Sequence, residues 1–286
     1  MERTGKVLGV PKTNVEYWLK RHRIKRHLLR KYPRFSFSGD LFEKAYLVGL
    51  RFGDLCAVRH GKGILVTTTT THPAMLLLFL TTFERYGHVS FSPSYNKRYD
   101  EYQWTARVTL NLTFSFLVLK GGRVPKWMAS DKIATIWFLA GFVDAEGTVG
   151  IIFRIADGRY QIMRPYLSVS NADLGLLRHI AKLTKQYSSR LSLSQRGGTP
   201  TSRQGSIRKR DQWALWISRR RVLKDLLKIL PLRHIEKISK AVLALKVISG
   251  GQWDQMREEY ENLRVETGMD VVDLAGMAAI LLHKSD

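Results

Sequence analysis

One short pattern occurs twice in the sequence, and this repeat constrains the fold more than any other feature. Residues 47–54 read LVGLRFGD and residues 139–146 read LAGFVDAE, 92 positions apart. The segments THPAML at 71–76 and NADLGL at 171–176 lie 100 positions apart, and YQW at 102–104 recurs as DQW at 211–213, 109 positions apart. Chance similarity between short apolar segments is the alternative, but the three matches keep their order. A duplicated unit with longer hairpins in its second copy explains the growing offset.

Each half of the chain has the periodicity of helix, two strands, helix, two strands, helix. In the first half we expect helices at 40–53, 72–86 and 113–120, and strands at 54–60, 63–70, 88–94 and 102–111. In the second half we expect helices at 130–146, 173–187 and 219–230, and strands at 148–156, 160–170, 189–196 and 212–218, with further helices at 235–249, 252–266 and 270–283. The expected domains are a basic N-terminal extension (1–38), a first repeat (39–120), a linker (121–129), a second repeat (130–250) and an acidic C-terminal segment (251–286).

The charge of the chain favours a polyanionic partner. The formal net charge is +23, and residues 1–40 hold eleven Lys or Arg against three Asp or Glu. Nucleic acid is the first candidate. A membrane partner is disfavoured because no apolar run approaches the ~20 residues of a spanning helix. The N-terminus has no apolar segment typical of a signal peptide, and the single cysteine excludes an internal disulfide, so we expect an intracellular protein.

Small residues recur four positions apart in the two repeated helices: Gly49 with Gly53, and Gly141 with Ala145. Positions i and i+4 lie on one face of a helix, and small residues there let two helices approach closely. Glycine inside a helix costs about 1 kcal/mol relative to alanine, which indicates that the close approach has a use. We therefore expect these two faces to pack on each other.

One acid follows each small-residue stripe, Asp54 in the first half and Glu146 in the second. If the helices pack as expected, the two carboxylates meet at the C-terminal ends, where the helix dipole is negative and acids are disfavoured. They would also repel each other. A cation should compensate, and hard oxygen ligands favour Mg²⁺. Two exposed acids without a role are the alternative, which the repetition at equivalent positions disfavours.

Several expected strands alternate between apolar residues and Arg, Gln, Thr or Ser, which indicates one buried and one polar face. Polar groups of these types can donate to bases and phosphates, although a face that only meets water remains the alternative. The candidate DNA-contacting residues are Arg59, Thr67, Thr69, Lys97, Arg98, Gln103, Thr105, Arg107, Arg154, Arg164, Tyr166, Ser168, Ser170, Arg190, Ser192, Ser194, Arg196 and Arg208.

The two repeated segments resemble the paired motifs of the LAGLIDADG homing endonucleases. Residues 139–147, LAGFVDAEG, match nearly every position, whereas residues 47–55, LVGLRFGDL, have Phe52 at the first acid and Leu55 at the final glycine. In that family the acid at the eighth position binds metal, and here it is Asp54 and Glu146. The resemblance covers about residues 40–250 and is closest to single-chain, intron-encoded members of archaeal type. It implies an α+β fold, a pseudo-twofold duplicated αββαββα unit whose two antiparallel four-stranded sheets form a DNA-binding saddle.

The resemblance also implies a function. It implies a monomeric endonuclease that cuts both strands of a long asymmetric DNA site across the minor groove and leaves short 3′ overhangs. Mg²⁺ would be the cofactor, with Mn²⁺ substituting and Ca²⁺ supporting binding without cleavage. Basic residues near each acid would assist catalysis. Lys120 and Lys237 are the candidates by position, with Arg123, Lys126 and Lys240 as rivals, and an ordinary phosphate contact is the alternative for each.

Other readings stay open. A relative on the same fold that does not cleave, an RNA maturase or a DNA-binding regulator, is the alternative function, although retention of both acids favours cleavage. A general polyanion binder explains the charge but not the duplication. Residues 7–20 resemble part of a helix-turn-helix, and the loop 196–211 holds five basic residues suited to a hairpin tip along DNA. Cys56 is expected to be packed, and the eight histidines show no spacing typical of a zinc site.

Overall fold

The computed structural model describes residues 21, 32–97, 101–118, 124–200 and 207–266. The chain divides into two units, Met1–Pro33 and Arg34–Asp286, and every element below belongs to the second. Several predictions lie outside the described residues: the helix-turn-helix-like segment 7–20, the helix at 270–283, and the side chains of Arg98, Lys120 and Arg123.

The first repeat begins with a helix whose N-terminus is capped by Asp40, whose carboxylate accepts a hydrogen bond of 2.8 Å from the Glu43 backbone. Its elements are α3 (Leu41–Phe52), β1 (Cys56–His60), β2 (Gly63–Thr70), α4 (Pro73–Phe83), β3 (Val89–Asn96), β4 (Glu101–Leu110) and the 3₁₀ helix η1 (Leu112–Leu117). The segment expected as a helix at 113–120 is thus a short 3₁₀ helix.

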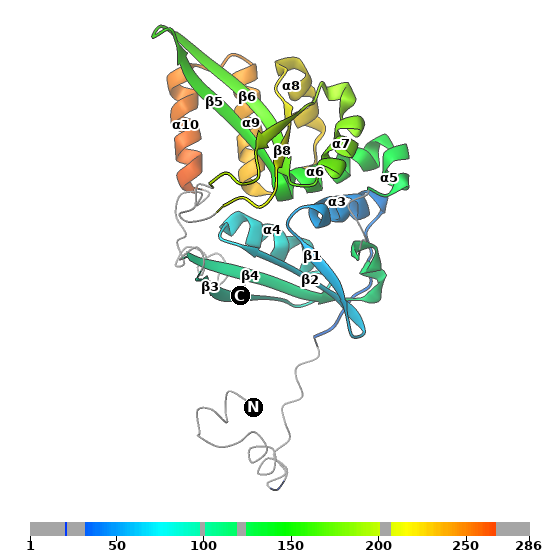
Figure 1. The fold of residues 1–286 in the computed structure, drawn as a ribbon. Coiled ribbons are helices and arrows are strands. Elements are labelled where there is room, and N and C mark those ends of the chain that lie inside the picture. Colours follow the sequence, from blue (N-terminus) through cyan, green and yellow to red (C-terminus); the bar gives the residue numbers. More distant parts are fainter. Residues whose placement is uncertain (1–20, 22–31, 98–100, 119–123, 201–206, 267–286) are drawn as a thin grey trace. The chain divides into compact units, whose positions relative to one another are not determined.

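The second repeat has the same order, and Asp131 caps its long helix by accepting from the Ile133 and Ala134 backbones at 2.8 and 3.1 Å. Its elements are α5 (Lys126–Ser130), α6 (Lys132–Glu146), β5 (Gly147–Ala156), β6 (Tyr160–Asn171), α7 (Leu174–Leu183), the 3₁₀ helix η2 (Lys185–Tyr187), β7 (Arg190–Gln195), β8 (Gln212–Ile217), α8 (Arg220–Ile229), α9 (Ile235–Ile248) and α10 (Trp253–Glu266). The short helix α5 occupies part of the expected linker (Figure 1).

Each repeat builds a four-stranded antiparallel sheet with the same strand order. The order is β1-β2-β4-β3 in the first and β5-β6-β8-β7 in the second. Each strand of the first repeat therefore has the same place in its sheet as the corresponding strand of the second repeat, as a duplicated αββαββα unit requires. The predicted α+β architecture with two antiparallel four-stranded sheets is confirmed.

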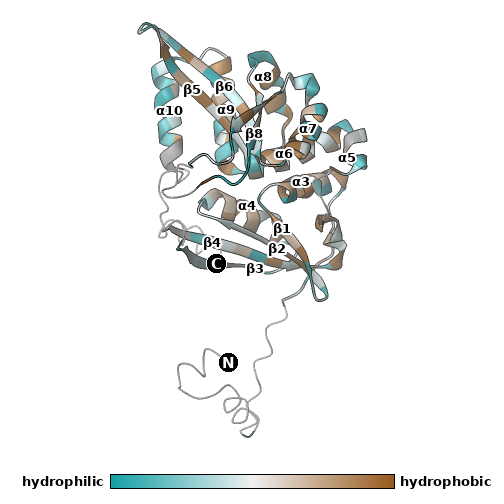
Figure 2. Ribbon diagram, viewed as in Figure 1, coloured by the Kyte–Doolittle hydropathy of each residue, from teal (hydrophilic) through white to brown (hydrophobic). Residues whose placement is uncertain are grey.

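The helices cover one face of each sheet, and the core lies between them. Buried apolar residues of α3, α4, α6 and α7 form one continuous cluster with the inward residues of both sheets. Figure 2 shows strongly apolar stretches on α3 and α6, where the two repeats meet. The acidic helix α10 packs against the inward face of β5, since Trp253 and Tyr260 both contact the ring of Phe153. No helix of the described residues is long and apolar enough to cross a membrane.

Two expectations about side-chain burial are wrong. The apolar alternation of residues 190–196 predicts that Leu193 faces inward. Leu193 is instead exposed, although it keeps the regular pairing with Trp213 and the register shift of β7 against β8 begins only after it. Cys56 was expected to be packed but is exposed, because it begins an edge strand and the inward position falls on Ala57.

Candidate active site

The two repeated helices, α3 and α6, pack directly on each other between the sheets (Figure 1). A methyl group added at Gly49 would overlap the Phe138 carbonyl oxygen and lie 2.7 Å from the Phe142 nitrogen. One added at Gly141 would overlap the Tyr46 carbonyl oxygen and lie 3.0 Å from the Leu50 nitrogen. The backbones approach so closely that only glycine fits at the crossing.

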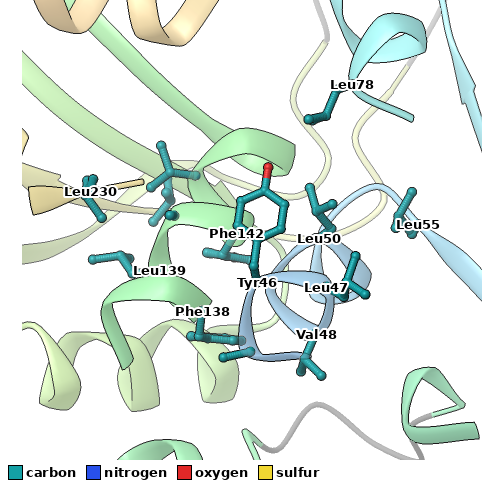
Figure 3. Close-up of a cluster of buried hydrophobic side chains, with 14 of the residues drawn as sticks. Tyr46, Leu47, Val48, Leu50, Leu55, Leu78, Phe138, Leu139, Phe142 and Leu230 are labelled. Atoms are coloured by element: carbon teal, nitrogen blue, oxygen red, sulfur yellow. The ribbon is translucent and has the colours of Figure 1, made fainter. Parts of the chain in front are cut away.

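Apolar side chains fill the space on either side of this crossing. Figure 3 shows Tyr46 and Leu50 of α3 beside Leu139 and Phe142 of α6, and all four are buried in the continuous core. The crossing is therefore rigidly held, and the C-terminal ends of the two helices have fixed positions relative to each other.

Both candidate acids lie at these C-terminal ends. Asp54 follows Gly53, the C-cap residue of α3, and Glu146 is the last residue of α6. A methyl group added at Gly53 would overlap the Ala145 side chain and lie only 2.9 Å from Glu146 Cγ. The structure thus brings together the four small interface residues and both acids, although they come from segments far apart in the sequence.

The electrostatics of the two carboxyls reflect this proximity. Burial, and second the charge of Asp54, raise the pKa of Glu146 to about 7, although the nearby Lys237 opposes the rise. Burial also raises the pKa of Asp54, and Lys237 again opposes it. Two carboxylates are therefore held in a place where neither ionises easily.

The donor set at this place fits a hard divalent cation. Both residues keep solvent-accessible surface, although the surrounding protein partly desolvates their carboxyl groups, so both can present carboxylate oxygens to a ligand. Carboxylate oxygens are the ligands that Mg²⁺ and Ca²⁺ prefer, and a dication would offset both the burial and the repulsion that raise the pKa of Glu146. Asp54 and Glu146 are the residues that would hold it.

Lys237 of α9 lies beside both acids, but all three N–H donors of its ammonium group already make hydrogen bonds within the protein. Its Nζ donates to the carbonyl oxygens of Val143, Asp144 and Ala145 at 2.7, 2.5 and 3.2 Å. An ammonium has three N–H donors, so this side chain satisfies the carbonyls that end α6. Burial lowers the pKa of Lys237 to about 8, and the surrounding carboxylates limit the change. Of its rivals, Lys240 is buried against Glu236 at 2.6 Å and Lys126 is exposed.

A cavity of about 260 Å³ opens beside Asp54. His72, His234 and Glu236 line one side of it, and their candidate ligand atoms lie within 4.8 Å of one another. Sequence reasoning did not find this cluster, because His72 comes from the first repeat and the other two residues from the second. Histidine spacing along the chain carries no signal when the fold brings the residues together.

Sequence reasoning also missed the buried polar network that crosses the helix interface. The Tyr46 hydroxyl donates to Asp144 Oδ2 at 2.5 Å, and the Arg233 backbone nitrogen donates to the same oxygen at 2.7 Å. The Arg233 guanidinium lies 4.1 Å from the Tyr46 ring centre and pairs with Glu43. Asp144, the first acid of the second motif, thus has a structural role.

The outward face of the first sheet is polar, as the alternation predicted. Thr69 and Thr105 face each other with hydroxyls 3.2 Å apart, and Arg107 donates to the Ser92 hydroxyl at 3.2 Å. The predicted residues Arg59, Thr67, Lys97 and Gln103 also lie on the exposed or half-buried side of this sheet or at its edge. Strand β3 adds three serines to the same face that were not predicted from the sequence: Ser90, Ser92 and Ser94 pair with Arg107, Thr105 and Gln103.

The outward face of the second sheet is more basic. All but one of its predicted DNA-contacting side chains are exposed or half-buried. These are Arg154, Arg164, Tyr166, Ser170, Arg190, Ser192, Ser194, Arg196 and Arg208. The exception is Ser168, which was expected to face solvent but is only 7% exposed, because it sits between Thr148 and Trp216 in the sheet. Tyr166 packs on the Trp216 ring, with centroids 4.9 Å apart.

The comparisons with known proteins bear on the fold. No protein-family model and no curated protein matches the sequence. Among solved structures, I-SmaMI bound to uncleaved DNA target in the presence of calcium ions is 10% identical, with a TM-score of 0.50, over 80% of this chain and 99% of that chain.

A second solved structure, the LAGLIDADG meganuclease I-AabMI bound to uncleaved DNA, is 12% identical, with a TM-score of 0.50, over 76% of this chain and 98% of that chain. I-SmaMI is itself described as a LAGLIDADG homing endonuclease. At such low identity the likeness establishes fold and nothing finer. The resemblance predicted from the two repeated motifs is therefore confirmed at this level: the chain has the fold of the LAGLIDADG homing endonucleases.

Proposed function

We propose that the chain is a site-specific DNA endonuclease that cleaves both strands with Mg²⁺ bound by Asp54 and Glu146. The observation that carries this proposal is the meeting of the two acids at adjacent helix ends, with the pKa of Glu146 raised to about 7. A protein does not gain stability by placing two partly buried carboxyls together. Such a pair is a candidate functional site, and here its donors suit a divalent ion.

Each residue has a definite part in the proposed chemistry. Asp54 and Glu146 bind the cation, one from each repeat, so that a single chain serves both DNA strands. When bound, the divalent ion supplies charge stabilisation at the phosphate and lowers the pKa of water. Mn²⁺ is expected to substitute, and Ca²⁺ to support binding without cleavage. Lys237 fixes the last turn of α6 through three carbonyls and favours ionised acids, so we assign it a positioning role.

The outward faces of the two sheets are the proposed DNA-binding surface. Hydroxyl, amide and guanidinium groups such as Thr105, Gln103 and Arg107 offer the donors and acceptors that read base edges and phosphates. The net charge of +23 supplies attraction that does not depend on sequence. I-SmaMI and I-AabMI, which share the fold, are both described bound to DNA.

The test is cleavage of a plasmid that carries the proposed target, the locus of this reading frame in its intron-less form. The wild-type chain with Mg²⁺ should linearise this plasmid and leave short 3′ overhangs. Asp54→Asn and Glu146→Gln should each reduce the rate by more than the ~10- to 100-fold that loss of an outer-shell metal partner costs. Asp225→Asn, which changes an exposed acid on α8, is the matched control and should cut normally.

Binding measured with Ca²⁺ separates the possible outcomes. Retained binding together with lost cleavage in both acid variants supports the proposal. Cleavage that survives both substitutions shows that the acids are wrongly assigned. Binding without cleavage by the wild-type chain, in Mg²⁺ and in Mn²⁺, favours the alternative of a DNA-binding regulator or an RNA maturase.

A further inference from the structure

Three side chains with nitrogen and oxygen donors gather at the junction of the two repeats and line the same cavity as Asp54. His72 is the residue before α4 in the first repeat. His234 and Glu236 are the residue before α9 and a residue of its first turn, in the second repeat. His234 is 3% exposed and Glu236 is 7% exposed, whereas the side chain of His72 is 29% exposed toward the cavity.

The protein itself leaves part of the hydrogen-bonding capacity of this cluster unused. His72 Nε2 lies 2.9 Å from Glu236 Oε2, close enough for an ion pair. Nδ1 of His72 and Nδ1 of His234 are both buried without a hydrogen-bond partner. Buried polar atoms are nearly always satisfied, and an ion or a water molecule is the usual partner when the protein supplies none.

The distances and the chemistry suit a transition-metal ion. Ligand atoms at about 2.0–2.2 Å from a tetrahedral ion lie roughly 3.3 Å from one another. The observed separations, 2.9 Å for one pair and at most 4.8 Å within the group, span that value. A neutral imidazole offers a nitrogen lone pair to such an ion. Imidazole nitrogens favour zinc and similar ions over Mg²⁺ or Ca²⁺, which take oxygen ligands.

The surroundings of Glu236 also resemble those of a metal ligand. Lys240 Nζ donates to Glu236 Oε1 at 2.6 Å, which leaves Oε2 directed toward His72. Carboxylates that bind metals are commonly oriented by such an outer hydrogen bond. The ammonium groups of Lys237 and Lys240 oppose a cation, but the same cavity wall carries the carboxyls of Asp54 and Asp144.

We propose that His72, His234 and Glu236 bind one divalent transition-metal ion of the zinc type, at a site separate from the Asp54 and Glu146 pair. The cavity leaves room for water or another small ligand to complete the coordination. Because the ligands come from both repeats, the ion clamps one repeat to the other. This site does not depend on the proposed nuclease function, since its ligands and its metal preference differ.

The experiment titrates the full chain, first freed of metal with EDTA, with CoCl₂ and then with ZnCl₂. One equivalent of Co²⁺ should give a visible absorption band that Zn²⁺ removes and excess Mg²⁺ does not. Zn²⁺ at a hundredfold excess over its Kd should raise the Tm by about 5 °C. His72→Gln should abolish the band and the Tm shift, whereas His60→Gln, on an exposed strand end, should keep both.

The site can be told apart from the acid pair. The double variant Asp54→Asn with Glu146→Gln should retain the Co²⁺ band while losing DNA cleavage. His234→Gln should also lose the band, and if this buried substitution unfolds the chain, the partly exposed His72→Gln decides. The proposal is overturned if the wild-type chain gives neither band nor Tm shift. It is equally overturned if the band survives His72→Gln or disappears in the double acid variant.

Discussion

The two halves of the helix interface solve the same packing problem in different ways. Positions 46 and 138 are equivalent across the repeat offset of 92, and so are positions 52 and 144. On one side Tyr46 donates a buried hydrogen bond of 2.5 Å to Asp144. On the other side Phe138 packs edge-on against Phe52, with ring centroids 5.8 Å apart.

This difference separates two roles that the motif combines. The first acid of the motif is Asp144 in the second repeat and is replaced by Phe52 in the first, so an aromatic ring can take its place in packing. The acid two positions later is kept in both repeats, as Asp54 and Glu146, although the pKa of Glu146 rises to about 7 there. The packing position therefore accepts either an acid or an aromatic side chain. The helix ends, in contrast, keep a carboxyl group in both repeats despite its electrostatic cost.

The largest loss of stability is expected at a glycine of the α3–α6 crossing, because both the polar and the aromatic side of the interface depend on this close approach. Gly141→Ala places a methyl group against the Tyr46 carbonyl oxygen and 3.0 Å from the Leu50 nitrogen, both backbone atoms that cannot turn aside. We expect the free energy of unfolding to fall by about 3 kcal/mol, despite the ~1 kcal/mol helix preference of alanine. Urea unfolding followed by circular dichroism measures it.

Gly175→Ala is the matched control for this substitution. Gly175 also lies in a helix, α7, but a methyl group there meets only one Asp173 side-chain oxygen, at 3.2 Å. This variant should be as stable as the wild type or slightly more stable. Equal stability of the two variants would show that α3 and α6 can separate without cost, contrary to the packing described above.

The sequence predicted this interface well because its signals are local. Spacing of small residues reports which face of a helix packs, and Asp54 and Glu146 follow directly from the end of each stripe. Strand alternation placed Arg107 and Thr105 outward, but it failed at Leu193, the last residue of β7 before the register shift, which is exposed.

Contacts between distant segments left no such local signal. The His72, His234 and Glu236 cluster and the hydrogen bond from Tyr46 to Asp144 depend on how the repeats meet. Burial of Ser168 depends on the neighbouring strands, not on its own strand.

The next effect concerns the polar side of the interface alone. Tyr46→Phe removes the hydroxyl from a buried carboxyl that keeps its backbone donors at Arg233 and His234. Hydrogen bonds to charged groups contribute roughly 1.5–3 kcal/mol, so we expect a loss near 2 kcal/mol. A double-mutant cycle with Asp144→Asn should show coupling of about 1 kcal/mol or more. Additive effects would mean that the pair is matched only in shape, like Phe52 and Phe138.

A smaller effect should separate the two helix ends. Lys237 holds the carbonyls of α6, whereas the last turn of α3 is held by Arg51, which donates to the Leu55 and Leu117 carbonyls at 3.0 and 3.2 Å. Lys237→Met removes the charge that lowers the pKa of Glu146. We expect that pKa to rise by roughly one unit, equivalent to about 1.4 kcal/mol. Carboxyl ¹³C NMR measures it, and Lys237→Arg should leave it nearly unchanged.

The smallest effect is a dependence of stability on pH that should differ between the two acids. The pKa of Glu146 is about 7 in the folded chain against 4.5 for an ordinary glutamate, so its contribution to stability is present below pH 4.5 and is lost as the pH rises toward 7. In the presence of EDTA, Glu146→Gln should therefore gain roughly 1 kcal/mol relative to wild type between pH 5 and pH 8, since partial exposure reduces the full linkage effect. The pKa of Asp54 is also raised, but its side chain is exposed, so Asp54→Asn should gain less. Urea unfolding at the two pH values measures both differences, and equal gains would show that the carboxyl sites of the two repeats are electrostatically equivalent.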